Sequence, residues 1–160
     1  MKSRWTAMAG GLMLGAFSAG AQEYRAGALT AEHPWARPAA GPNKLGAAYL
    51  ILKNAGQGPD TLQSVSSPDA EKVEIHEHTQ DASGIMRMRR VEGGLKIPAG
   101  GTVEFKPGGY HLMLLGLKHS LEEGQQIPLK LRFAHAGDLE IEVKIEKKPS
   151  APAAMHEHKG

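Results

Sequence analysis

Three short segments of the sequence each carry a pair of side chains that can bind a soft metal ion, with the two members of a pair two positions apart. The pairs are His76 and His78, Met86 and Met88, and His111 and Met113. A thioether is a soft, uncharged ligand that selects Cu(I) over zinc, magnesium or calcium, whereas an imidazole binds copper in either oxidation state. The donor types therefore indicate copper, and Cu(I) before Cu(II).

The spacing of two residues has a structural meaning if these segments are β-strands. Side chains alternate across a strand, so residues at positions i and i+2 share a face. Each pair would point to one side of its strand, and apolar neighbours such as Ile75 and Leu112 would point to the other. Three such strands can bring the pairs onto one patch. Each donor also has an ordinary explanation, because a strand Met is commonly core filler and a strand His is commonly a solvated surface residue.

The region from His33 to Glu146 consists of short segments rich in Val, Ile, Leu and Tyr, separated by Gly, Pro, Asn and Asp. This pattern is typical of an all-β domain. The strands that it predicts are Glu32–Arg37, Ala47–Lys53, Thr61–Val65, Val73–Thr79, Ile85–Val91, Leu95–Ile97, Thr102–Lys106, His111–Leu117, Ile127–Ala134 and Leu139–Glu146. No stretch sustains helical periodicity beyond two turns, so we expect an antiparallel Greek-key β-sandwich or barrel.

The N-terminal segment has the features of a secretory signal peptide. Two basic residues precede an apolar run from Ala7 to Ala19, and Ala19-Gly20-Ala21 is a small-residue cleavage site. The run is shorter than the stretch of about 20 residues that crosses a bilayer. We therefore expect residues 1–21 to be removed after Ala21 rather than kept as an anchor, and we expect no membrane span in the mature protein.

We expect the mature chain to divide into a copper-binding β domain, residues 22–147, and a flexible tail, residues 148–160. The tail is rich in Lys, Pro, Ala, His and Gly, which cannot supply a core. It contains Met155, His156 and His158, a candidate second copper site in which the imidazoles would bind Cu(II). A solvated terminus is the alternative interpretation.

The absence of cysteine limits the chemistry further. With no Cys among 160 residues, neither disulfides nor thiolate ligands are available. This excludes a blue-copper electron-transfer centre. Removal of residues 1–21 would leave equal numbers of basic and acidic residues, so the charge gives no reason to expect a nucleic-acid partner. The serines have no His–Asp partner that the sequence identifies, and we expect no enzymatic activity.

At the Met and His pairs the sequence closely resembles a known family. The run VEIHEHTQDASGIMRMRRVEGGLKIPAGGTVEFKPGGYHLMLLGL, residues 73–117, is similar to the periplasmic copper chaperones of the PCu(A)C type, and the resemblance extends to residues 33–56 and 129–133. The family's pattern of a His, a Met and a His-x-Met maps onto His76, Met88, His111 and Met113. The intervals of 12 and 23 residues are each about one residue longer here than in the family, which implies a loop insertion and keeps His78 and Met86 open as alternative ligands.

The resemblance implies a cupredoxin-like fold and a Cu(I) site near the protein surface. It also implies a periplasmic chaperone that delivers copper to an acceptor, namely the binuclear copper centre of cytochrome c oxidase, reached through an oxidase subunit or its assembly factor. We expect the protein to be a monomer. Copper storage or detoxification, with Cu(II) also held by the tail, is the alternative function. A third hypothesis is a β-sandwich interaction module in which the Met and His residues are incidental, and it predicts no tight Cu(I) binding.

Overall fold

The computed structural model describes residues 23–42 and 44–148. The expected signal peptide and the tail donors Met155, His156 and His158 lie outside these residues, so both predictions stay predictions. The described part of the chain contains eleven strands and no helix. The strands are β1 (Glu23–Ala26), β2 (Leu29–Ala36), β3 (Gly46–Asn54), β4 (Asp60–Ser66), β5 (Ala70–Gln80), β6 (Met86–Arg90), β7 (Leu95–Ile97), β8 (Thr102–Glu104), β9 (Tyr110–Leu117), β10 (Gln126–Phe133) and β11 (Gly137–Ile145).

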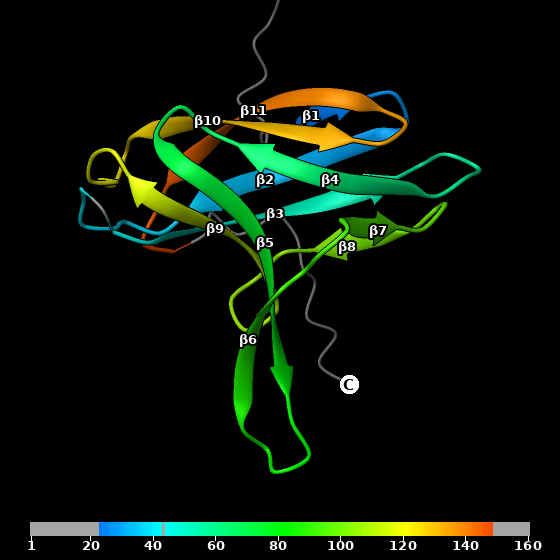
Figure 1. The fold of residues 1–160 in the computed structure, drawn as a ribbon. Coiled ribbons are helices and arrows are strands. Elements are labelled where there is room, and N and C mark those ends of the chain that lie inside the picture. Colours follow the sequence, from blue (N-terminus) through cyan, green and yellow to red (C-terminus); the bar gives the residue numbers. More distant parts are fainter. Residues whose placement is uncertain (1–22, 43, 149–160) are drawn as a thin grey trace, which may run out of the picture.

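Seven of these strands close into a barrel. Their order is β2-β11-β10-β4-β5-β9-β3, and β3 pairs back onto β2 to complete the ring (Figure 1). Neighbours are antiparallel except β11 and β2, which run parallel. The four short strands β1, β6, β7 and β8 pair with β2, β5, β4 and β3, respectively. The prediction of an all-β Greek-key barrel is confirmed.

The barrel interior is filled by apolar side chains from every strand of the ring. In β10 and β11 the alternation predicted from the sequence is realised, because Leu129 pairs with Ile141 and Leu131 with Leu139, and all four are buried. Burial of one such side chain contributes about 1.5–3 kcal/mol relative to exposure. A domain without disulfides therefore has a hydrophobic core that can hold its strands in fixed register.

The predicted strands are all present, and their bounds differ from the structure by at most three residues. The sequence reading missed β1, whose four residues are mostly polar and lie at the surface. This strand forms because Gly27, with a φ of 56°, turns the chain back so that β1 pairs with β2. Strand β2 accordingly begins at Leu29 rather than at Glu32.

Strand β5 is part of both the barrel wall and the β5–β6 hairpin. Val73 pairs with Val65 of β4, and the pairing of β5 with β9 extends from Ala70 to Glu77, so this part is barrel wall. From His76 onward it also pairs with β6. The β5–β6 hairpin extends away from the barrel, and its connecting loop lies at the far end (Figure 1). The hairpin and the barrel wall therefore share one continuous strand.

Candidate metal centre

Strand register brings the three predicted donor pairs onto one surface, which we call the donor face. Strand β5 lies between β6 and β9. On the β9 side His76 lies opposite His111, and on the β6 side His78 lies opposite Met88. Residues directly opposite each other in an antiparallel pair point to the same side of the sheet. The donor face is completed by residues opposite one another at its two ends: Met113 with Glu74, and Met86 with Gln80.

Three imidazole rings meet at the centre of the donor face. The ring centroids of His76 and His111 are 5.6 Å apart, and those of His78 and His111 are 5.0 Å apart. The rings of His78 and His111 are stacked, with an angle of 29° between their planes. His111 therefore contacts both histidines of β5.

The donors differ strongly in exposure. His111 is 3% exposed and Met113 is 9% exposed, because β9 lies in the barrel wall. Met88 is 50% exposed and Met86 is 55% exposed, because β6 lies on the hairpin outside the barrel. The donor face thus runs from a rigid, buried end to an open one.

The histidine nitrogens are not satisfied by the protein alone. Nδ1 of His76 and Nδ1 of His78 are both buried and have no hydrogen-bond partner. Nδ1 of His111 lies 3.5 Å from the carbonyl oxygen of Gly109. A buried polar atom without a partner costs about 1–3 kcal/mol, and in native proteins such atoms commonly mark a functional site or a bound ion. A metal bound to these nitrogens would remove that cost.

Glu74 determines which nitrogen of His76 is free to bind a metal. Its carboxylate lies 2.8 Å from Nε2 of His76, 2.7 Å from Nζ of Lys72 and 3.6 Å from a guanidinium nitrogen of Arg90. The hydrogen bond from Lys72, then that from His76 and the charge of Arg90, lower the pKa of the Glu74 carboxyl to about 2, against the effect of burial. An ionised carboxylate can only accept, so Nε2 of His76 donates to it, and Nδ1 is the ring nitrogen left to bind a metal. A carboxylate that orients a ligating imidazole in this way is common around metal sites.

His111 is held in the neutral form that metal binding requires. Burial lowers the pKa of its ring, the hydrogen bond to Gly109 opposes this, and the charges of His78 and His76 lower it further. At neutral pH the buried end of the donor face therefore presents an uncharged imidazole beside an uncharged thioether.

The structure brings together every predicted donor that it describes, including the two alternatives. His78 lies as close to the centre of the face as His76, because it stacks on His111 and faces Met88. The choice between His76 and His78, and between Met86 and Met88, stays a prediction. The sequence reading missed Glu74, although its position two residues before His76 placed it on the same face.

A metal site on this face would draw on thioether sulfur as well as imidazole nitrogen. Within residues 23–42 and 44–148, no three or more His, Cys, Asp or Glu side chains are grouped so that they could hold a metal ion. The histidines would need Met113 or Met88 to complete a ligand set. The donor chemistry of this face consequently fits a soft ion such as Cu(I) better than zinc.

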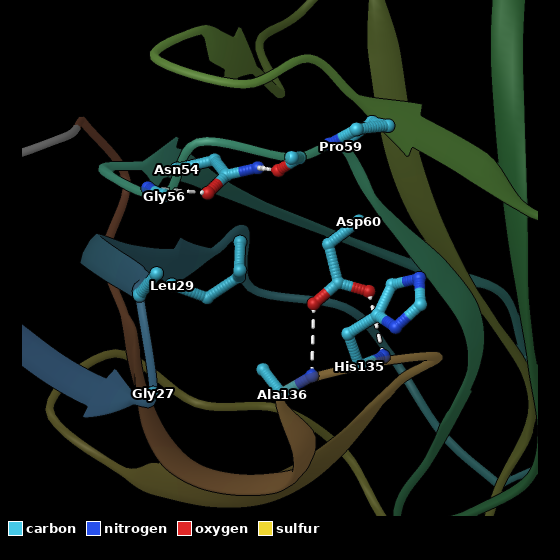
Figure 2. Close-up of a pocket in the computed structure, with 10 residues that line it drawn as sticks. Gly27, Leu29, Asn54, Gly56, Pro59, Asp60, His135 and Ala136 are labelled. Carbon is cyan, nitrogen blue, oxygen red and sulfur yellow. Dashed lines mark hydrogen bonds between the residues drawn. The ribbon is translucent and has the colours of Figure 1, made fainter.

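A separate cavity of about 450 Å³ lies at the ends of β2, β3 and β4 (Figure 2). The carboxylate of Asp60 accepts hydrogen bonds of 2.7–2.9 Å from the backbone N–H groups of Thr61, His135 and Ala136. Burial alone would raise the pKa of Asp60, but these three donors lower it below its usual value. Because the carboxylate is fully engaged in holding turns together, we assign this cavity a structural role.

The fold and the donor face define a small β-barrel domain with a His- and Met-lined metal site at one edge. Residues 29–145 match the family described as "Putative lipoprotein LpqE-like". The chain belongs to this LpqE-like family. Within the part of the chain that the structure describes, no helix is long and apolar enough to cross a membrane.

Two curated relatives support the family assignment. The chain is 37% identical over 100 residues to "Putative lipoprotein Lxx21020" of Leifsonia xyli subsp. xyli (strain CTCB07), a match that covers 62% of this chain and 60% of that protein. It is 30% identical over 115 residues to "Uncharacterized protein RP573" of Rickettsia prowazekii (strain Madrid E), covering 70% and 63%, respectively. The match spans less than two thirds of either relative.

Solved structures similar to this one include PCuAC domains, which confirms the cupredoxin-like fold. An apo PCuAC domain from PmoF1 has a TM-score of 0.68 at 29% identity and covers 79% of this chain and all of that domain. A copper-bound PCuAC domain from PmoF2 has a TM-score of 0.67 at 28% identity, covering 79% and 99%. The solution structure of CuI-DR1885 from Deinococcus radiodurans has a TM-score of 0.55 at 30% identity, covering 72% and 77%. These likenesses support membership of the PCuAC family.

Proposed function

We propose that this protein is an exported copper chaperone that carries Cu(I) on the donor face and passes it to an acceptor protein. The observation that carries the proposal is the register of β6, β5 and β9, which places imidazole and thioether donors from three strands on one face. The copper-bound PCuAC domain from PmoF2 and CuI-DR1885 support copper as the metal. A carrier needs no catalytic base, and we propose no enzymatic role.

The ligand set that we propose is His76, Met88, His111 and Met113, with His78 and Met86 as alternatives. His111 and Met113 are fixed by the barrel wall and would form the permanent part of the site. Glu74 engages Nε2 of His76, which leaves Nδ1 as the nitrogen that can bind the metal. Met88 approaches from the hairpin. All four ligands are uncharged, so Cu(I) keeps its charge and remains attractive to a thiolate- or imidazole-bearing acceptor.

The cellular setting is part of the same proposal. The lipoprotein descriptions of the family and of the Leifsonia relative support export, and we propose that residues 1–21 direct the chain to the periplasm and are removed after Ala21. The acceptor that we propose is the binuclear copper centre of cytochrome c oxidase, reached through an oxidase subunit or its assembly factor. This step rests on the family resemblance of residues 73–117.

Copper storage is the second candidate function, because of the tail. Met155, His156 and His158 would add a site at which imidazoles bind Cu(II). Storage predicts more than one copper ion per chain and no transfer to an acceptor, whereas a chaperone needs one exchangeable Cu(I).

An anaerobic titration tests these alternatives. The protein from Gln22 onward, with and without residues 149–160, competes for Cu(I) with a chromophoric chelator. We expect one tight equivalent that survives removal of the tail and is lost when His111→Ala and Met113→Leu are combined. The Leu replacement nearly conserves volume, so the fold should persist, which circular dichroism checks.

A His135→Ala variant is the matched control, because it removes an imidazole that lies at the cavity of Figure 2 rather than on the donor face. It should bind copper as the unmodified protein does. Binding that disappears with the tail alone would favour storage. The absence of any tight equivalent would refute the chaperone proposal and favour the interaction module.

A further inference from the structure

The outer end of the donor face carries an unusual amount of exposed apolar surface. Among the described residues, the large hydrophobic side chains that stand exposed are Leu45, Ile85, Met86 and Met88. Three of these four lie on the β5–β6 hairpin, and every residue of β6 is exposed. Among the residues that the structure describes, the exposed thioethers therefore lie on this hairpin.

Core packing does not explain why the residue at this position, Met86, is a methionine. The residue lies opposite Gln80 at the end of the hairpin, beyond the last pairing of β5 with β9. Its side chain is 55% exposed, so it contributes little to the core, and a polar residue would fit a two-stranded surface ribbon better. Its position two residues before Met88 places both sulfurs on the donor face.

The donors form a row that leads outward. Met113 and His111 are buried in the barrel wall, the two histidines of β5 come next, and Met88 and then Met86 follow along the hairpin. Successive positions on one face of a strand are about 7 Å apart, a distance that two flexible thioether side chains can bridge. A Cu(I) ion released from the inner donors thus meets Met88 first and Met86 last.

The outer edge of β6 is open to a partner. In the described residues β6 pairs only with β5. The backbone N–H of Asp81 donates to Ile85, and that of Val91 donates to Ile75. Since backbone groups alternate in direction along a strand, those of Met86 and Met88 face away from β5. An acceptor can approach this edge without contacting the barrel.

We propose that Met86 is a transfer ligand, which takes Cu(I) from the resident site and presents it to the copper-binding group of an acceptor. This inference rests on the proposed function. It goes further by assigning the binding of Cu(I) and its release to different ligands. A bond from copper to the sulfur of Met86 forms while a bond to an inner donor breaks, and a donor atom of the acceptor then replaces that sulfur. Copper stays Cu(I), and no proton or electron is transferred.

The test separates equilibrium affinity from transfer rate. The full mature chain and its Met86→Leu variant are loaded with one Cu(I), and stopped-flow absorbance follows transfer to a chromophoric Cu(I) chelator. We expect Met86→Leu to lower the affinity less than Met88→Leu does and to slow transfer roughly tenfold, equivalent to about 1.4 kcal/mol in the transfer barrier. Met88→Leu should mainly weaken the affinity itself.

A double variant controls for the position of the sulfur. Arg87 points to the opposite face of β6 and pairs with Asp81 at 3.0 Å. Met86→Leu combined with Arg87→Met keeps the thioether count but moves one thioether off the donor face, so transfer should stay slow. Arg87→Met alone, which controls for the lost ion pair, should transfer at the unmodified rate.

Three results would overturn the inference. A loss of affinity in Met86→Leu as large as that in Met88→Leu would make Met86 a resident ligand. An unchanged transfer rate in Met86→Leu would give it no role, and restoration of the rate by Arg87→Met in the double variant would show that the face does not matter. If the unmodified protein bound no Cu(I) tightly, that result would refute the proposed function itself, and the inference about Met86 would be refuted together with it.

Discussion

Replacing Glu74 by Gln should weaken both the fold and the metal site, and the structure allows the size of the effect to be worked out. The carboxylate contacts Lys72, His76 and Arg90 and lies opposite Met113. Gln keeps the shape and one acceptor oxygen but removes the charge. The change therefore isolates the electrostatic part of the interaction.

The pH at which this contribution disappears follows from the pKa of Glu74. The carboxyl has a pKa of about 2 in the folded protein against an ordinary value of 4.5. Because the folded pKa is lowered, the stabilisation is fully present above about 4.5 and is lost as the pH falls toward about 2. At about 1.4 kcal/mol per pKa unit, the shift from 4.5 to about 2 sets an upper limit of about 3 kcal/mol.

Solvent reduces this limit. The Lys72 and Arg90 side chains are 56% and 52% exposed, so their attraction to Glu74 is screened, and we expect Glu74→Gln to cost about 1–2 kcal/mol at pH 7. Urea denaturation followed by the fluorescence of the buried Trp35 measures the free energy of unfolding from pH 7 to pH 3. The difference between the variant and the unmodified protein should shrink across the acidic range.

The control for this experiment is Glu140→Gln. Glu140 is exposed and lies 3.6 Å from Lys130, so its removal should change stability little. A cost for Glu74→Gln no larger than that of Glu140→Gln, or one that stays constant from pH 7 to pH 3, would refute the assignment. Cu(I) affinity should fall roughly 10-fold or more in Glu74→Ala, which loses the acceptor for His76, and less in Glu74→Gln.

Three further changes probe the scaffold. Asp60→Asn should cost about 1–3 kcal/mol in the free energy of unfolding, because a buried carboxylate that accepts three backbone hydrogen bonds is lost, and Cu(I) titration should show unchanged binding. The hydrogen bond that the His119 ring donates to the Asp69 carboxylate raises the pKa of that ring, so Asp69→Asn should move the pKa back toward 6.5, as NMR titration of the ring would show. Gly116→Ala should cost about 1–2 kcal/mol, because Gly116 has a φ of 63° and L residues are strained there; urea denaturation measures it.

The strands were predictable from the sequence because their signals are local. Alternation of apolar and polar residues located β10 and β11 nearly to the residue, and glycine turns separated most of the others. The pairing order was not predictable in the same way. Nothing local indicates that β11 runs parallel to β2 or that β5 lies between β6 and β9, since such pairings depend on contacts between residues far apart in sequence.

The same distinction between local and long-range signals explains which features of the donor face could not be predicted from the sequence. Spacing established that each donor pair shares a face, but the choice between His76 and His78 depends on register, and register places both beside His111. Glu74 was missed because a carboxylate on a strand is usually a solvated side chain. Its contacts with His76 and with Arg90 of the neighbouring strand arise only when the strands pair.

The division of β5 between barrel and hairpin gives a physical reason why one site could both hold copper and release it. The donors on β9 are buried in the barrel wall, whereas β6, among the described residues, pairs with a single strand and is exposed throughout. Segments with few buried contacts open locally at much lower free energy than the core. A ligand set drawn from both can therefore lose its outer thioether without disturbing the barrel, and copper held by the remaining donors would then be open to attack by an acceptor.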